Sequence, residues 1–274
     1  MWFYGIMIKI KSEVMCVKLT HMDAIYKLYD TVESCHSMAV GAHPDDCEII
    51  GIKGINDKGF FAVVTTHGAI DQPLIQMRQN EQACAAKLGH YLGYAMLGYD
   101  SNVVKRLYRP LIDDYKKLML TLRPEVIYTH SLFDKHDTHV GVVYHLIHAL
   151  LELKDSYMPK RVLGCEVWRD LDWLKDSDKI VLDTSETMVL QEQLLQCFTS
   201  QTKMKRYDKA VIARQIGHAV FQDAYQANAV QGVLIATDLM PLLMQPAMTI
   251  ESYVNETLNR FNKTVLEKIN RYGV

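Results

Sequence analysis

The segment 41–48, GAHPDDCE, constrains this chain most, because it places a histidine and two carboxylates within one turn. The apolar run 38–40 before it predicts a buried strand, and residues 48–57 after it can start a helix. Sites in α/β sheets are built where strands end. We therefore predict that His43 and Asp46 lie at such an edge as metal ligands, with Asp45 between them as a base.

Strand and helix patterns alternate along the rest of the chain. Further strands are predicted at 60–66, 91–97, 125–129, 161–168 and 179–182, and helices at 23–32, 73–88, 103–122, 140–153, 185–198, 207–219 and 252–269. Alternation favours a parallel sheet covered on both faces. We predict an α/β, Rossmann-like three-layer fold with a mostly parallel central sheet. One domain would span 1–274, in which 1–22 can be an N-terminal extension and 156–274 can supply capping elements.

Composition excludes several classes of protein. The chain has 274 residues, 49% of them hydrophobic, which is ample for a core and permits a homo-oligomer. A net charge of −2 is not the basic charge expected of a nucleic-acid-binding protein, and it predicts no strong electrostatic attraction of acidic substrates. No run approaches the roughly 18 apolar residues of a membrane span, and the apolar start at 1–7 is too short for a secretory leader. Six scattered cysteines without C-x-x-C indicate reduced thiols in a cytoplasmic protein.

A second polar group follows the predicted strand 125–129. Residues 134–139, DKHDTH, supply His136 and His139. If the two strands are parallel neighbours, the metal site closes as His43, Asp46 and His139, and His136 faces the substrate carbonyl. A Zn²⁺ with three protein ligands keeps a position for water and lowers its pKa to about 7, and a carboxylate can take the proton. The pattern predicts metal-dependent hydrolysis of an amide.

On these stretches and two more, the sequence resembles the LmbE/PIG-L superfamily of zinc-dependent de-N-acetylases. Segment 42–48 matches the family pattern A-H-P-D-D-x-E, and 134–139 is similar to D-x-H-x-D-H. RQNE at 78–81 resembles the R-x-x-E helix, and LGYD at 97–100 resembles the strand end L-G-x-x-D. The resemblance covers roughly residues 36–145.

The resemblance implies roles for individual residues. His43, Asp46 and His139 would hold the metal, Asp45 would be the general base, and His136 would stabilise the oxyanion and help protonate the leaving amine. Arg78 and Asp100 match positions that contact the sugar. The implied reaction removes acetyl from an N-acetylglucosamine-type substrate with Zn²⁺, although a His₂Asp site also accepts Fe²⁺. The implied partner is a small acetylated amino sugar, with no nucleic acid.

Three departures from the family pattern keep other functions open. Thr138 replaces an aspartate near the histidines, the usual glycine pair is altered to Gly51 and Gly54, and Ala69 replaces an acidic residue. A non-catalytic sugar- or metal-binding protein is therefore the alternative. A nucleotide-binding Rossmann domain would need G-x-G-x-x-G where this chain has two carboxylates that repel a pyrophosphate.

Simpler roles compete at several positions. Asp45 or Asp46 can cap the following helix, Arg78 and Glu81 can form a surface pair, and Asp100 can be a turn residue. The Trp168 and Trp173 side chains can line a sugar-stacking wall or pack in the core. The remaining histidines fit structural or surface roles: His67, His130, His145, His148 and His218.

Overall fold

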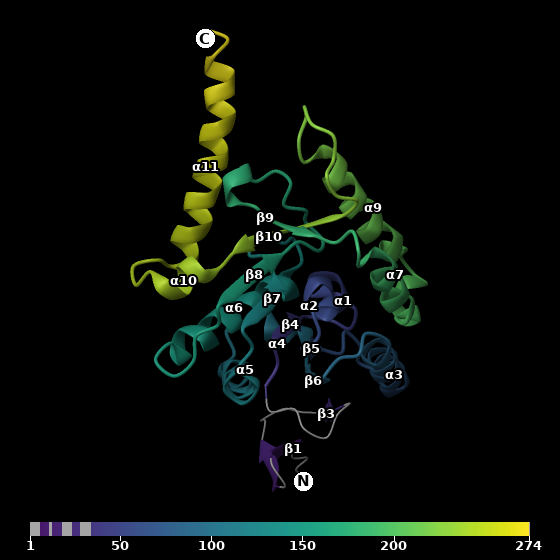
Figure 1. Cartoon of the computed structure of the whole chain (residues 1–274). Helices are drawn as coiled ribbons and strands as arrows, with labels where there is room; N and C mark the ends of the chain where they lie inside the picture. The colour runs from purple at the N-terminus through teal and green to yellow at the C-terminus, as the bar shows by residue number, and fades with distance from the viewer. Residues whose placement is uncertain (1–5, 11–12, 18–23, 28–33, 274) are drawn as a thin grey trace.

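The computed structural model describes residues 6–10, 13–17, 24–27 and 34–273, and a mixed sheet forms its centre (Figure 1). The strand order in the described part is β3-β6-β5-β4-β7-β8-β10-β9. Strands β6, β5, β4, β7 and β8 run parallel, whereas β3 and β10 run against their neighbours. The bounds are β3 Ala24–Lys27, β4 Ser37–Gly41, β5 Phe60–Thr66, β6 Gly93–Tyr99, β7 Val126–His130, β8 Arg161–Cys165, β9 Ile180–Asp183 and β10 Val233–Asp238. The predicted α/β class with a mostly parallel sheet is confirmed.

Helices cover both faces of this sheet (Figure 1). Neighbouring strand residues point to opposite faces, so Met38 and Val40 join one apolar core and Ala39 joins the other. The first core includes residues of α5 Arg109–Leu122, α6 Asp137–Leu153, α10 Met240–Met244 and α11 Ile250–Asn270. The second includes residues of α1 Asp46–Ile50, α2 Ile52–Asn56, α3 Gln72–Leu88, α7 Met188–Gln196 and α9 Tyr207–Phe221. The remaining short helices are α4 Ser101–Val104, η1 Asp176–Asp178 and α8 Thr199–Thr202.

Three local predictions need correction. The helix expected at 23–32 is wrong over Ala24–Lys27, which form the edge strand β3 antiparallel to β6, a partner that local spacing cannot reveal. The helix expected at 103–122 is divided into α4 and α5, and Pro110 lies in the first turn of α5, where its missing N–H costs nothing. Strand β10 was not predicted.

The N-terminal stretch expected as an extension holds a hairpin of β1 Ile6–Ile10 and β2 Glu13–Val17. Its other residues lie outside the described ones. No helix in the described part is long and apolar enough to cross a bilayer. The cysteines in 34–273 are free thiols, and Cys84 Sγ lies 2.8 Å from Cys197 Sγ.

The carboxyl ends of β4 and β7 meet at one edge, because these strands are parallel neighbours. The Ala42 N–H, just after β4, donates to Nε2 of His130 at the end of β7 over 2.9 Å. Strand β9 ends at the same edge and the antiparallel β10 begins there, so residues 184–232 leave and re-enter the sheet beside these loops. We call residues 184–232, which include α7, α8 and α9, the cap.

Candidate metal centre

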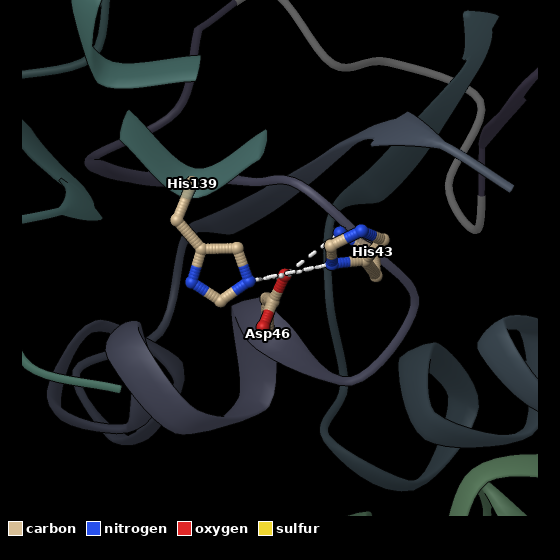
Figure 2. A group of neighbouring side chains, drawn as sticks. All are labelled: His43, Asp46 and His139. Carbon is tan, nitrogen blue, oxygen red and sulfur yellow. Dashed lines mark hydrogen bonds and ion pairs between the residues drawn. The ribbon is translucent and has the colours of Figure 1, made fainter. Parts of the chain in front are cut away.

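Three predicted ligands converge at this edge (Figure 2). His43 Nδ1 lies 3.2 Å from Asp46 Oδ2 and 3.3 Å from His139 Nε2, and His139 Nε2 lies 3.4 Å from Asp46 Oδ2. Ligands bound to Zn²⁺ at about 2.0–2.1 Å in a tetrahedron lie about 3.3–3.4 Å apart. The three atoms therefore have the spacing of one face of a tetrahedral metal site.

The protonation states of the group also suit a metal. Burial lowers the pKa of His139 to about 4, so its imidazole is neutral near pH 7 and offers a lone pair. Burial acts to raise the pKa of Asp46, but the His139 and His130 rings and hydrogen bonds to the carboxylate lower that pKa well below its usual range. Both residues are thus in the form that ligates.

Two side chains to which the sequence analysis gave no role in the site support His139. Asp134 Oδ2 lies 3.1 Å from His139 Nδ1, the arrangement that fixes the ring of a ligating histidine. Its other oxygen accepts the backbone N–H of Lys135 and of His136. The fully buried His130 ring stacks on His139 with centroids 3.8 Å apart. Asp134 is the first residue of the 134–139 motif, and His130 is the last residue of β7, the strand before it. Their positions in the sequence were the only signal that either belongs to the site.

Asp45 lies beside the three ligand residues with an unusual backbone. Its φ of 93° lies in the left-handed region, which strains a residue with a side chain. It is the N-cap residue that precedes α1, but its side chain makes no capping hydrogen bond there. Its Oδ2 instead accepts from the Tyr207 hydroxyl. Burial, then the neighbouring Asp46 carboxylate, raises the pKa of Asp45 well above its usual range, which suits a group that must take up a proton.

His136 lines the cavity that His43, Asp45 and Asp46 also line. Its ring centroid lies 5.0 Å from that of His43 and 4.5 Å from that of His139. Burial lowers its pKa, so the ring acts as a neutral N–H donor near pH 7. Within the described residues its buried Nδ1 has no hydrogen-bond partner, and neither does the Thr138 hydroxyl.

Arg78 also reaches the cavity. It is buried, its Nη1 donates to the His67 carbonyl over 2.6 Å, and its Nε has no partner among the described residues. A Cβ at Gly68 would lie 2.5 Å from Arg78 Nη1, and Gly68 has a φ of 60°, so only glycine fits there. Glu81 does not pair with Arg78, because its oxygens accept from Thr199 and Ser200 of α8.

Asp100 lies apart from the main cavity. It caps α4, where its Oδ1 accepts the Asn102 N–H over 2.6 Å. It lines a smaller adjoining depression that shares Gly68 and Ser101 with the main cavity. The predicted sugar contact of Asp100 stays a prediction.

The main cavity has a volume of about 590 Å³, and the cap forms one wall of it. Gln201 donates to the Pro44 carbonyl, and Tyr207 contacts Asp45, so the cap closes over the first motif. Trp168 continues the wall, with its ring 6.4 Å from His136 and nearly parallel to it. The sequence analysis assigned no cap residue to the site, because these contacts join positions more than 150 residues apart.

Fold and site together define an α/β protein with a His–Asp–His candidate metal group at the carboxyl edge of its sheet. Residues 38–151 match the PIG-L family, described as GlcNAc-PI de-N-acetylase. This stretch is a domain of the PIG-L (LmbE-like) family, and the resemblance seen in the sequence is confirmed. No curated protein sequence matches the chain significantly.

Solved structures share the fold at low sequence identity. The conserved protein TT1542 from Thermus thermophilus has a TM-score of 0.63 and 16% identity, covering 78% of this chain and 99% of that one. GalB, the 4-carboxy-2-hydroxymuconate hydratase from Pseudomonas putida, has a TM-score of 0.59 and 16% identity. The match covers 78% of this chain and 98% of that one. The N,N'-diacetylchitobiose deacetylase from Pyrococcus horikoshii has a TM-score of 0.58 and 15% identity. The match covers 78% of this chain and 86% of that one.

Proposed function

We propose that this protein is a metal-dependent hydrolase that removes an N-acetyl group from an N-acetylglucosamine-type sugar or conjugate. The observation that carries the proposal is the triangle of His43, Asp46 and His139 atoms at 3.2–3.4 Å, with Asp45 and His136 in the same cavity. The family description and the deacetylase among the structural neighbours support it. The chain 1–274 would act as one domain whose cap completes the pocket.

Each residue has a defined task in this reaction. Zn²⁺, or Fe²⁺ in the same donors, would be held by the three ligands and would polarise the acetyl carbonyl and the attacking water. Asp45 takes the proton of that water. His136 donates its N–H to the oxyanion, and the proton held by Asp45 then passes to the leaving amine. Arg78 and Trp168 position the sugar.

The test is release of free amine from a panel of N-acetylated sugars. Asp45→Asn should retain metal, measured by elemental analysis, and should lower kcat by about 100-fold or more. His139→Ala should lose the metal. Undiminished turnover by D45N would remove Asp45 as the base.

Two other outcomes would point elsewhere. Tight sugar binding without turnover would favour the non-catalytic alternative suggested by Thr138 and Ala69. Water addition to an unsaturated carboxylate, without amine release, would favour the chemistry named for the hydratase with this fold. The cytoplasmic location and the homo-oligomer stay predictions.

A further inference from the structure

The main cavity is much more basic than the chain around it. Among the 19 residues that line it, five are lysine or arginine, whereas the whole chain has 30 such residues in 274. Its only acidic lining residues in the described part are Asp45 and Asp46, which belong to the candidate metal centre. The net charge of −2 therefore conceals a local excess of positive charge at the pocket, which can attract an anion.

Not all five cations are available to a ligand. Arg206 is committed to Asp208 through two hydrogen bonds of 2.9 Å, and Arg78 is buried against the His67 carbonyl. Lys105 and Lys205 are exposed, and Arg214 is partly buried. Within the described part of the chain, no ion pair joins Lys105, Lys205 or Arg214 to a carboxylate. Their charges are not compensated by the protein.

Two of these cations contact consecutive residues of the segment after β8. The Lys205 Nζ lies 4.4 Å from the centre of the Trp168 ring, and Arg214 Nη1 donates to the carbonyl of the preceding residue, Val167. The Trp168 ring in turn lies beside His136. A neutral carbonyl and an indole ring hold both side chains in place without cancelling their charge.

From this convergence we propose that Lys205 and Arg214 form an anion subsite of the pocket, which binds a phosphate or carboxylate group on the substrate away from the metal centre. The inference rests on the proposed function and adds a substrate class to it: the N-acetylated sugar carries an acidic substituent. Arg214 can present its planar fork to two oxygens, and Lys205 supplies a compact charge in the lining of the same pocket.

Binding to metal-free protein tests the subsite, because a bound metal would itself attract phosphate. Calorimetry with chelator-treated protein would compare N-acetylglucosamine, N-acetylglucosamine 1-phosphate and N-acetylmuramic acid. We expect at least one anionic ligand to bind about tenfold more tightly than the neutral sugar, with a preference that weakens as salt increases. The two anionic ligands distinguish a phosphate from a carboxylate subsite.

Charge variants locate the effect. Lys205→Gln and Arg214→Gln should each reduce the preference by about threefold or more and leave the affinity for neutral sugar unchanged. Arg214→Lys keeps the charge if R214Q folds poorly, and should retain part of the preference. Lys268→Gln, an exposed lysine on α11, is the matched control.

Equal affinity for neutral and anionic sugars, or a preference that survives both Gln substitutions, would overturn the subsite. The proposed function fails separately, since it requires amine release by the metal-loaded protein. A deacetylase without anion preference would contradict only the subsite.

Discussion

At positions 136 and 138, two buried polar atoms have no hydrogen-bond partner in the described structure. The family pattern has an aspartate where this chain has Thr138, and both the Thr138 hydroxyl and His136 Nδ1 are buried without a hydrogen-bond partner in the described structure. An unpaired buried polar atom costs about 1–3 kcal/mol. We therefore expect Thr138 to support His136 less well than an aspartate would, while the three predicted ligand atoms stay close together.

Thr138→Asp should restore a carboxylate beside His136. Since groups that orient catalytic histidines are typically worth about 10–100-fold, we expect kcat to increase by about tenfold. The acidic limb of the pH–rate profile should move upward, because a carboxylate favours the charged imidazolium over the neutral His136 ring. Steady-state kinetics across pH would measure this. Thr138→Asn is the neutral control, and equal rates for both variants would show that the charge is not needed.

Glu48 gives a pH prediction. It is fully buried, its Oε1 accepts from Gln82 and Tyr91, and burial raises its pKa to about 7. The folded protein thus holds this proton more tightly than the unfolded chain does. The resulting stability is complete below about pH 4.5, and it is lost as pH rises to 7.

Glu48→Gln should remove this dependence. Metal-free wild type and E48Q should have similar melting temperatures near pH 4.5. By pH 8 the free energy of unfolding of the variant should exceed that of wild type by about 3 kcal/mol. Thermal melts across this range would measure the difference. A constant offset between the two proteins would contradict the raised pKa.

Among the elements, those that carry the proposed metal ligands were predictable and the cap was not. Strands β4, β5 and β7 are apolar runs followed by turn residues, and α6 starts at the motif itself, so local sequence reports them. The role of α9 depends on Tyr207 meeting a residue 162 positions earlier, which no local pattern encodes. β10 is a short apolar run whose partners, β8 and β9, are also distant.

The start of α9 offers an element-scale test. Tyr207→Phe removes the hydroxyl that donates to Asp45, and a hydrogen bond to a charged group contributes about 1.5–3 kcal/mol. We expect kcat to fall by about tenfold or more, with little change in KM. Tyr225→Phe, at an exposed tyrosine of the cap, is the control. A change confined to KM would indicate that Tyr207 only contacts substrate.

Helix α3 and the end of α7 can be joined covalently. Cys84 is exposed, and its Sγ lies 2.8 Å from that of Cys197, so a disulfide reagent should oxidise the two thiols to one disulfide with loss of two hydrogens. Peptide mapping under non-reducing conditions would find the Cys84–Cys197 linkage. Cys84→Ser should abolish it. Labelling of both thiols after oxidation would contradict the prediction.

At the scale of the whole molecule, the ligands come from distant stretches that only the fold unites. His43 and Asp46 follow β4, and His139 lies on α6 after β7, so an ion held by the three proposed ligands would tie together segments about a hundred residues apart. A ligand that binds only the folded state stabilises it by about 2.7 kcal/mol at 100 times its Kd.

Chelation should therefore lower Tm, and added Zn²⁺ should restore it. Differential scanning calorimetry with and without chelator would measure the shift. His139→Ala should melt at the same temperature in both conditions, which separates the ion from general effects of the chelator. A wild-type Tm insensitive to chelation would argue against a resident metal.

The two ends of the cap are paired neighbours: Asp183, the last residue of β9, lies opposite Val233, the first of β10. The chain thus leaves the sheet and re-enters it at two paired residues, so the pairing of β9 with β10 does not depend on the length of the segment between them. Insertions and deletions in the exposed stretch 222–229 of the cap would leave the strands that precede the predicted ligands undisturbed. Helices α7 and α9, which pack against the sheet, and Tyr207, which contacts Asp45, mark the part of the cap that we expect to tolerate little change.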